Sequence, residues 1–557
     1  MTTGSDWLAR AIASTGSTHV FFMDAVLRRT LIALEGLGIE RVLAHSEKAA
    51  AYMADGHARV AGRPVFCFAQ SVGAANLAAG LQDAFLGRSP VVALTGRKPT
   101  ALQHRNAYQE IAHLPLFQPV TKFNVEVDTA ADLPRLLRQA IRAAASGTPR
   151  PVHLDLFGVQ AEVVEGGTTN ESPEIGTEPM AMPPHRPTPP DDEIERAAVA
   201  LRGAKRVAIV AGEGALLSGA GAEVLALAEA LGAPVATSLG ARALLPTRHR
   251  LAIGVPGFYS APPANRIVHR ADLVLYVGCD TSDQVTDTWR IPSPGTPIVQ
   301  IDIDPEELGR SYPTTFGLMG DPRATLAKLI AAVGRPLRDP EYAEWAGGVV
   351  AEWRTAMQPA MASGQTPIRP ERLCAELSAV LGEDAILVAD TGFSGIWTGT
   401  CIEFNGTGQS YLRAAGSLGW SYPASLGARL AAPNRKVVCF CGDGAFYYHL
   451  PELETARRRG IATVTVINNN SGFGQGWPTL LGMQGTTPGH PEQILRFGPT
   501  DFAAIARGFG VQGLRVERPE AIAPALSQAM AMDEPVVVDV VTDIMARAPE
   551  PWVAGGA

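Results

Sequence analysis

The chain lacks any block of basic residues. Its 47 Lys and Arg are outnumbered by 55 Asp and Glu, which gives a formal net charge of -8 at pH 7. Nucleic acids and anionic membrane surfaces attract proteins that carry clustered positive charge. This composition therefore argues against nucleic acid or a membrane as the main partner.

Long apolar runs are also missing. No segment reaches 18 unbroken apolar residues, the length at which a membrane-spanning helix is considered. The start, MTTGSDWLARAIAS, has neither the basic region and apolar stretch of a secretory signal nor the Arg- and Ser-rich character of a transit peptide. We therefore expect a cytoplasmic protein.

Cysteine is scarce, with six residues scattered along the chain. Only Cys439 and Cys441 lie close together, and their spacing in an apolar segment is too short for a C-x-x-C redox or zinc pair. Neither a disulfide framework nor a zinc site is indicated. We expect buried free thiols that behave as small apolar residues.

What the chain has is a repeated α/β pattern. At 557 residues it is too long for one ordinary core. Short apolar segments alternate with helical patterns, which is typical of βαβ units and of parallel sheets covered on both faces. Segment 163–192 contains seven prolines and reads as an exposed linker. We expect an α/β fold with an N-terminal domain at 1–165, a linker at 166–192, a middle domain at 193–345, a C-terminal domain at 366–545 and a tail at 546–557.

Ten apolar segments are the expected strands. They are RPVFCFA (63–69), SPVVALTG (89–96), RVAIVAG (206–212), APVATSL (233–239), ADLVLYVG (271–278), TPIVQIDIDP (296–305), DAILVAD (384–390), RKVVCFCGDG (435–444), ATVTVINNN (462–470) and PVVVDVV (535–541).

Polar groups follow two of these strands. In KVVCFCGDGAFYY a strand ends in a glycine-flanked turn that carries Asp443 and opens a helix, and such helix starts attract phosphate. The next apolar strand ends 27 residues later at Asn470. Parallel strands present their carboxyl ends at one edge, so both side chains can reach one ion. Their oxygens suit Mg²⁺ rather than zinc. Each piece alone is also typical of a plain turn or loop.

The GDG turn and the asparagines at this spacing resemble the signature of thiamine diphosphate enzymes of the pyruvate decarboxylase and acetolactate synthase superfamily. The resemblance implies that Asp443, Asn470 and the carbonyl of Gly472 bind Mg²⁺, which in turn holds the diphosphate of the cofactor. It also leaves Asn468 as an extra asparagine, at a position where the family usually has an apolar strand residue.

Segment 44–59, AHSEKAAAYMADGHAR, resembles the glutamate segment of the same superfamily. The resemblance makes Glu47 the acid that protonates the aminopyrimidine of the cofactor, a task that requires a pKa raised by burial. A solvated glutamate at a helix start is the alternative interpretation. Ser46 stands where many relatives have His, a difference that concerns the substrate pocket.

Two further segments resemble cofactor-facing parts of the family. AAGSLGWSYPASLGA (414–428) places Leu418 under the bent cofactor and the Gly416 carbonyl on its amine, although Leu418 could equally be plain core. QSVGAANLAAG (70–80) resembles the region that contains Asn76. The cofactor-binding residues implied by the resemblance are Asn76, Gly392, Phe393, Ser394, Gly416, Leu418, Gly442, Asp443, Gly444, Ala445, Asn470, Gly472 and Phe473.

The resemblance covers nearly the whole chain. It implies two copies of the thiamine diphosphate-binding fold around a Rossmann-like middle domain, in a homodimer or a dimer of dimers (a homotetramer) with active sites at the subunit interface. In the middle domain Gly212 and Gly214 follow a strand, but the third glycine of a dinucleotide fingerprint is misplaced. We therefore expect a vestigial or absent nucleotide site, and we rank an NAD-dependent dehydrogenase behind a thiamine enzyme.

The histidines and two segments, 104–123 and 471–500, bear on the type of reaction. No two of the eleven histidines are adjacent, unlike the His-His pair of pyruvate decarboxylases, which argues against simple 2-oxo acid decarboxylation. Segment 104–123 resembles the branch that contains acetolactate synthase, oxalyl-CoA decarboxylase and 2-hydroxyacyl-CoA lyase, and implies that Gln109 faces the reacting centre. Segment 471–500 is longer than in synthases and makes Glu492 a substrate-facing acid, or else a solvated helix-start residue.

The chain therefore most resembles a 2-hydroxyacyl-CoA lyase that yields formyl-CoA and a ketone or aldehyde, with 2-hydroxyisobutyryl-CoA as a candidate substrate. The alternatives are a carboligase like acetolactate synthase acting on pyruvate, an oxalyl-CoA-type decarboxylase, and a silent homologue that only binds, against which the intact Glu47, Asp443 and Asn470 speak. Segment 264–270, ANRIVHR, either meets the phosphates of CoA or is a solvated basic helix face.

Overall fold

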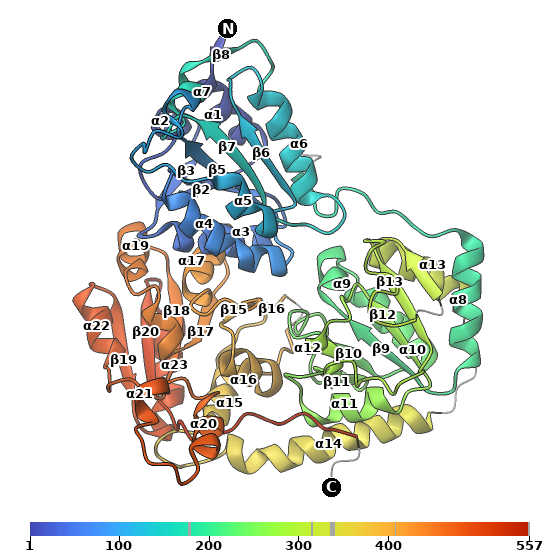
Figure 1. Ribbon diagram of the computed structural model, residues 1–557. Helices are drawn as coiled ribbons and strands as arrows, with labels where there is room; N and C mark the ends of the chain where they lie inside the picture. The colour runs from blue at the N-terminus through green and yellow to red at the C-terminus, as the bar shows by residue number, and fades with distance from the viewer. Residues whose placement is uncertain (177–179, 314–315, 335–339, 407, 555–557) are drawn as a thin grey trace.

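The structure is a computed structural model that describes residues 1–176, 180–313, 316–334, 340–406 and 408–554. It contains three six-stranded parallel sheets, each with helices on its faces, and a small antiparallel pair of β1 (Thr2–Thr3) with β8 (Thr168–Thr169) (Figure 1). The predicted α/β class with three parallel sheets is confirmed. The predicted linker and tail each extend into residues outside the described ranges.

The first and third sheets have the same topology. Counted within each domain, both follow the order 2-1-3-4-6-5. The N-terminal sheet consists of β3 (Glu40–Leu43), β2 (His19–Phe22), β4 (Val65–Ala69), β5 (Val91–Arg97), β7 (Val152–Phe157) and β6 (Phe123–Val127). The C-terminal sheet consists of β16 (Ser410–Arg413), β15 (Ile386–Ala389), β17 (Val437–Gly442), β18 (Thr463–Asn469), β20 (Val536–Val541) and β19 (Gln512–Val516). Two copies of one fold are therefore present.

The middle sheet has a different order, 3-2-1-4-5-6, which is that of dinucleotide-binding Rossmann folds. Its strands are β11 (Ala252–Gly254), β10 (Val235–Thr237), β9 (Val207–Ala211), β12 (Leu273–Val277), β13 (Ile298–Asp302) and β14 (Phe316–Met319). The helices that cover the three sheets include α1 (Gly4–Ser14), α2 (Arg28–Glu35), α4 (Gly73–Leu86), α6 (Leu133–Ala145), α8 (Asp191–Gly203), α10 (Gly221–Leu231), α11 (Pro262–His269), α13 (Pro322–Val333), α15 (Pro370–Val380), α19 (Glu452–Arg459), α22 (Phe502–Gly508) and α23 (Ile522–Ala531).

The N-terminal and C-terminal domains of one chain meet through two closely packed helices, α3 (Glu47–Ala61) and α17 (Ser421–Ala431). Glycines make this approach possible. A Cβ atom on Gly56 would lie 2.1 Å from the carbonyl oxygen of Ala424, and one on Gly427 would lie 1.9 Å from that of Met53. The small-residue patterns of both segments are thus used for main-chain contact between domains.

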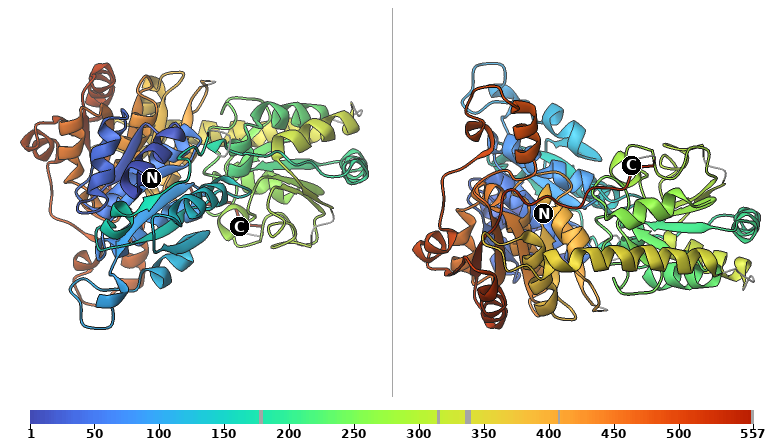
Figure 2. Two further views of the ribbon diagram at one scale, coloured as in Figure 1. Left: turned by 90° about the horizontal axis from the view of Figure 1, so that it is seen from above. Right: turned by 90° about the horizontal axis from the view of Figure 1, so that it is seen from below.

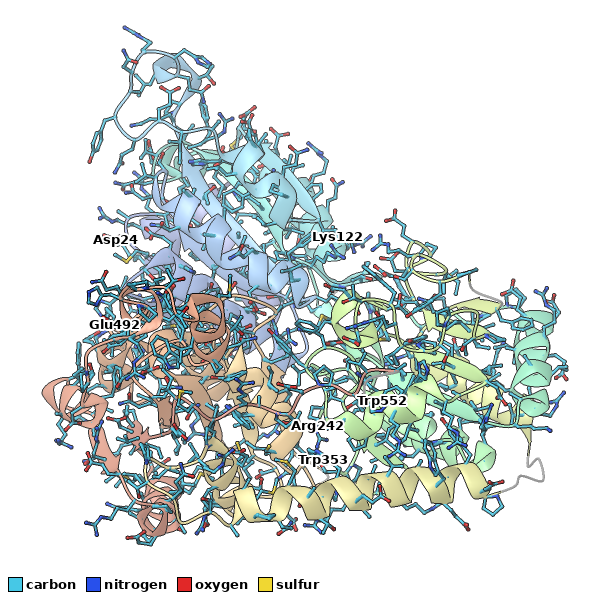
Figure 3. All side chains as sticks on the ribbon, turned by 60° about the horizontal axis from the view of Figure 1, so that its bottom comes forward. Asp24, Lys122, Arg242, Trp353, Glu492 and Trp552 are labelled. Atoms are coloured by element: carbon cyan, nitrogen blue, oxygen red, sulfur yellow. The ribbon has the colours of Figure 1, made fainter. Side chains whose placement is uncertain are left out.

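Two segments join the C-terminal domain to the middle domain. Helix α14 (Glu341–Met361) runs along the base of both (Figure 1). The chain after β20 passes the loop at 471–476, where Ile544 lies beside Gly472, and crosses to the middle domain. There the carbonyl of Trp552 accepts a hydrogen bond of 3.3 Å from the Asn265 amide (Figures 2 and 3). In the described ranges no helix combines the length and the apolar character that a membrane crossing requires.

Candidate active site

Asp443 begins α18 (Asp443–Tyr447) at the carboxyl end of β17 and is almost fully buried. One carboxylate oxygen accepts the N–H of Gly444 at 2.8 Å and the other accepts the N–H of Gly472 at 3.1 Å. Burial raises the pKa of this carboxyl to about 6, and the backbone donors act in the opposite direction. Asp443 therefore places a carboxylate beside the start of α18, and helix starts favour anions such as phosphate.

The three asparagines that end β18 divide by strand alternation. Asn469 points to one side, where its amide donates to the Thr500 carbonyl at 2.9 Å and to Asp539 at 2.8 Å. Asn468 and Asn470 point to the other side, and the Oδ1 atom of each is buried without a hydrogen-bond partner in the part of the chain that the structure describes. Two buried amide oxygens without a hydrogen-bond partner therefore lie in the same region as Asp443.

A cavity of about 440 Å³ lies over these groups. The first residues of α18 and of α16 (Phe393–Cys401) line this cavity. Gly392, which precedes α16, has φ +64°. Helix N-termini, a carboxylate and amide oxygens are the donor set for Mg²⁺ and a diphosphate. The lining residues are Tyr259, Thr391, Gly392, Phe393, Ser394, Leu418, Gly442, Asp443, Gly444, Ala445, Asn468, Asn470, Gly472, Phe473, Gly474, Gln475 and Gly476.

Most sequence-predicted cofactor residues come together in this cavity. The exceptions are Asn76 and Gly416, which are not among its lining residues. Six lining residues lie outside the predicted cofactor set: Tyr259, Thr391, Asn468, Gly474, Gln475 and Gly476. Tyr259 comes from the middle domain, and its hydroxyl accepts a hydrogen bond of 3.3 Å from the Gln475 amide. No local sequence signal points to Tyr259, because its place depends on how two domains dock.

The loop that carries Leu418 is held from two sides by buried carboxylates. Asp390, at the end of β15, accepts the N–H groups of Gly419 at 3.1 Å and of Ser421 at 2.9 Å. Asp83, from α4 of the N-terminal domain, accepts the N–H group of Ser417 at 2.9 Å. Both carboxylates are fully buried. The conformation of this loop therefore depends on residues from two domains.

Glu47 is the first residue of α3, after the N-cap Ser46. Its carboxylate accepts a hydrogen bond of 3.1 Å from the amide of Asn76, and a Cβ atom on Gly73 would lie 2.3 Å from it, so Gly73 makes room for the acid. Every residue that lines the cavity comes from Tyr259 or from residues 391–476. The structure of one chain therefore does not bring Glu47 into its own cavity.

Gln109 and Glu492 also lie outside the cavity lining. Gln109 has φ +62°, and its carbonyl accepts a hydrogen bond from the Ser71 hydroxyl. Glu492 begins α21 (Glu492–Leu495) on the outer surface of the C-terminal domain, half-exposed and 2.9 Å from the His490 ring (Figure 3). The end of α21 nevertheless contacts the loop at 471–476, which follows Asn470 and is called the metal loop below. The Phe473 N–H of this loop donates a hydrogen bond of 2.8 Å to the Leu495 carbonyl.

The glycines of the middle domain are explained by packing. A Cβ atom on Gly212 would lie 2.4 Å from the carbonyl oxygen of Gly278, and one on Gly214 would lie 2.8 Å from its Cα atom. These glycines thus let two loops at the sheet edge touch. The side chains of Glu213 and Asp280 lie in the same region, and Asp280 forms an ion pair of 3.3 Å with Arg88 of the N-terminal domain.

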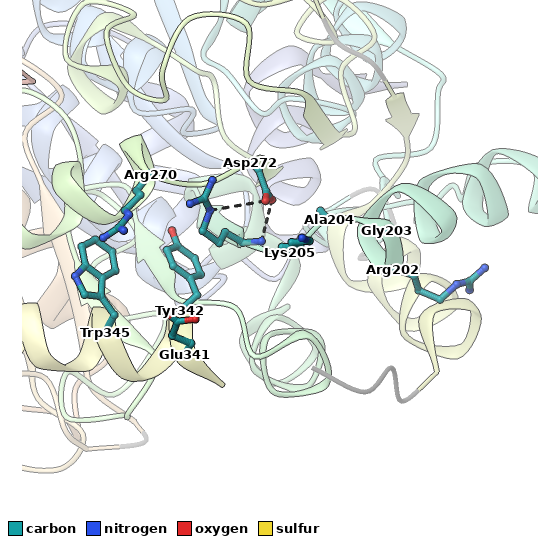
Figure 4. Close-up of a pocket in the computed structure, with 10 residues that line it drawn as sticks. Arg202, Gly203, Ala204, Lys205, Arg270, Asp272, Glu341, Tyr342 and Trp345 are labelled. Carbon is teal, nitrogen blue, oxygen red and sulfur yellow. Dashed lines mark hydrogen bonds and ion pairs between the residues drawn. The ribbon is translucent and has the colours of Figure 1, made fainter. Parts of the chain in front are cut away.

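The basic segment 264–270 lies away from the candidate active site. Arg270 stacks its guanidinium 4.6 Å from the centre of the Trp345 ring, in an open groove that also contains Lys205, Arg206 and Asp272 (Figure 4). These groove residues precede β9 and β12, so the groove lies at the amino edge of the middle sheet. Ligands of open α/β sheets bind at the opposite, carboxyl edge.

Comparison with known proteins gives consistent matches over the whole chain. Three families match: the N-terminal TPP binding domain of thiamine pyrophosphate enzymes at residues 2–116, their central domain at 194–329 and their C-terminal TPP binding domain at 390–540. A probable acetolactate synthase large subunit of Methanococcus aeolicus is 31% identical over 95% of this chain and 88% of its own length. An acetolactate synthase of Mycobacterium bovis is 31% identical over 100% of this chain and 90% of its own length. Acetolactate synthase isozyme 3 large subunit of Escherichia coli is 28% identical over 98% and 95%.

Proposed function

The chain belongs to the thiamine pyrophosphate-dependent enzymes of the acetolactate synthase and pyruvate decarboxylase superfamily, and from this premise we propose that it is a carboligase that joins 2-oxo acids such as pyruvate. The observation that carries the proposal is similarity to acetolactate synthases over almost the full length of both chains. The length of segment 471–500 indicated a 2-hydroxyacyl-CoA lyase. The names of these relatives instead favour the carboligase.

We assign the metal site to three oxygen donors. Asp443, the Oδ1 atom of Asn470 and the carbonyl of Gly472 hold Mg²⁺, and the starts of α16 and α18 bind the diphosphate. Thiamine diphosphate, when bound, supplies a nucleophilic carbon and an electron sink for bonds next to a carbonyl. The orphaned, buried Oδ1 atom of Asn470 supports this assignment, because a buried amide oxygen without a partner is unfavourable.

We assign proton handling to Glu47. A carboxyl group on the aminopyrimidine nitrogen holds and returns a proton there, and the Asn76 amide keeps its second oxygen oriented. Because Glu47 does not line the cavity of its own chain, we propose that it enters the cavity of a partner subunit. The working unit is then a homodimer, or a dimer of such dimers, with its active sites at the interface.

Leu418 would contact the cofactor from the cavity lining, and Asp390 and Asp83 are the positioning residues of its loop. This arrangement makes one pH dependence testable. Burial raises the pKa of Asp390 to about 6, while the pKa of an aspartate in the unfolded chain is about 3.9. The folded protein therefore takes up a proton between these values and gains stability as the pH falls through that window.

Asp390→Asn removes this titration. We compare the thermal midpoint of the variant with that of wild type at each pH. We expect the variant's midpoint minus the wild-type midpoint to be larger at about pH 7.5 than at about pH 5, because only wild type carries the buried charge at the higher pH. Differential scanning fluorimetry of both proteins without cofactor measures the difference. The same difference at both pH values would contradict the assignment of a raised pKa to Asp390.

A second candidate is the 2-hydroxyacyl-CoA lyase, and one observation favours it. Of the residues that line the described cavity, none is Lys, Arg or His. A carboxylate substrate such as pyruvate is ordinarily met by a cation, which in this case only the partner subunit's side of the site would supply, whereas the thioester carbonyl of an acyl-CoA needs none at the reacting centre. In this case Glu492, whose helix is attached to the metal loop, serves the leaving ketone or aldehyde.

One experiment separates the two. The purified protein with thiamine diphosphate and Mg²⁺ is given pyruvate and, separately, 2-hydroxyisobutyryl-CoA, and products are followed by chromatography. We expect acetolactate from pyruvate with the CoA ester unchanged. Formyl-CoA and acetone from the ester, with pyruvate unchanged, would overturn the carboligase in favour of the lyase. In that outcome Glu492→Ala lowers ester cleavage; in the expected outcome it leaves acetolactate formation unchanged.

A further inference from the structure

Asn468 is a polar residue on a face of β18 that is otherwise apolar. It is 3% exposed, and its Oδ1 atom has no hydrogen-bond partner among the residues described. Its neighbours in β18 on the same face are Val464 and Val466 toward the strand interior. A buried amide in such surroundings is costly unless something satisfies it.

The side chain of Asn468 is directed into the candidate active site. Asn468 pairs in register with Gly442 of β17, which has no side chain to cover it. A Cβ atom on Gly442 would find only the Ser394 hydroxyl within contact range, at 3.8 Å. All three residues line the cavity that contains Asp443. Asn468 therefore forms part of a polar floor of this cavity.

Asn468 lies two residues before Asn470, a Cα separation of about 6.6 Å in an extended chain. Asp443, Asn470 and Gly472 are already assigned to the ion as protein ligands, and Mg²⁺ usually keeps several waters among its ligands. This favours a place for Asn468 outside the first coordination sphere, within reach of a water molecule bound to the ion.

We propose that Asn468 is a further binding residue of this site, and that its Oδ1 atom accepts a hydrogen bond from a water bound to Mg²⁺. The proposal rests on the assignment of Mg²⁺ and thiamine diphosphate to the cavity, and it is independent of which substrate the enzyme uses. Mg²⁺ retains waters in most protein sites, and such waters are strong donors. Outer-sphere partners of this kind tune metal affinity.

Two variants test the proposal in binding experiments without substrate. Asn468→Leu keeps the branched shape of the side chain and removes the acceptor, so we expect Mg²⁺ affinity in the presence of thiamine diphosphate to fall by roughly 10–100-fold. Asn468→Asp keeps the acceptor and adds negative charge, so we expect Mg²⁺ affinity equal to or above that of wild type. Thr465→Val, in the same strand but outside the cavity lining, is the matched control and should bind as wild type does.

Mg²⁺ titrations followed by tryptophan fluorescence, repeated with Mn²⁺ by electron paramagnetic resonance, measure these affinities. Thermal midpoints of the proteins without cofactor show that the variants fold. Wild-type Mg²⁺ affinity in Asn468→Leu would overturn the proposal. So would a loss of both metal and diphosphate affinity in Asn468→Asp, since that result identifies the amide as a donor to phosphate. A wild-type protein that binds neither Mg²⁺ nor thiamine diphosphate would overturn the cofactor assignment, and with it the role of Asn468, whereas failure of the carboligase assay alone affects neither.

Discussion

Glu47→Gln abolishes turnover while the protein remains folded. General acid–base catalysis contributes typically ~10²–10⁴-fold, so we expect kcat to fall by at least about 10²-fold. Glutamine keeps the size and the hydrogen bond from Asn76 but cannot hold a proton for the aminopyrimidine. Steady-state kinetics on whichever substrate the product assay identifies, with saturating cofactor, measure the effect.

The matched control is Glu193→Gln, which changes another glutamate in the first turn of a helix, far from the cavity lining. It should leave kcat unchanged. An unfolding midpoint equal to that of wild type shows that Glu47→Gln is folded. Turnover at the wild-type rate in Glu47→Gln would remove Glu47 from the mechanism and leave it as a helix-start acid that stabilises α3.

Asp443→Ala is the change with the second largest expected effect. It removes the only carboxylate that lines the cavity in the described part of the chain. We expect Mg²⁺ affinity in the presence of thiamine diphosphate to fall by more than the roughly 10–100-fold that is typical of losing an outer-sphere partner. Activity is lost with it at ordinary Mg²⁺ concentrations. Fluorescence titration with Mg²⁺ provides the measurement.

Asp533→Ala, at an exposed position of the same domain, is the control and should titrate as wild type does. Undiminished Mg²⁺ affinity in Asp443→Ala would refute the metal assignment.

Mixing the Glu47→Gln and Asp443→Ala proteins also shows whether each variant is intact. If Glu47 and Asp443 of one site come from different subunits, an equimolar mixture of the two variants recovers up to about a quarter of wild-type activity after subunit exchange, because half the dimers carry one complete site.

The ten strands predicted from the sequence are all central or next to central, and all are present. Eight strands of the three large sheets were not predicted: the edge strands β3, β6, β11, β14, β16 and β19, and the interior strands β2 and β7. The apolar pattern of β2 and β7 is interrupted by His19, His153 and Asp155. For the edge strands the physical reason is burial. β4 and β9 are buried at every residue and read as continuous apolar runs, whereas β3 and β14 are partly exposed and read like loops. Continuous apolar character therefore reports burial on both faces rather than strand conformation itself.

The candidate site divides in a similar way. Asp443 and Asn470 could be predicted because each follows an apolar strand, and parallel strands bring their ends together. Asp83 and Tyr259 could not, because they act across domain contacts that no local pattern encodes. Glu47 could be named from its segment, but one chain does not place it in the cavity. Gln109 and Glu492 remain predictions, since both lie outside the cavity lining.

The contact between α3 and α17 has a meaning beyond packing. In domains of identical strand order, each of these helices follows the second strand of its own sheet. Equivalent helices thus face each other across glycines, as the two halves of a twofold symmetric homodimer do. The chain has the form expected of an ancestral pair joined by gene duplication. The GDG turn lies in one half and the glutamate helix in the other, so each half alone holds only part of the proposed site.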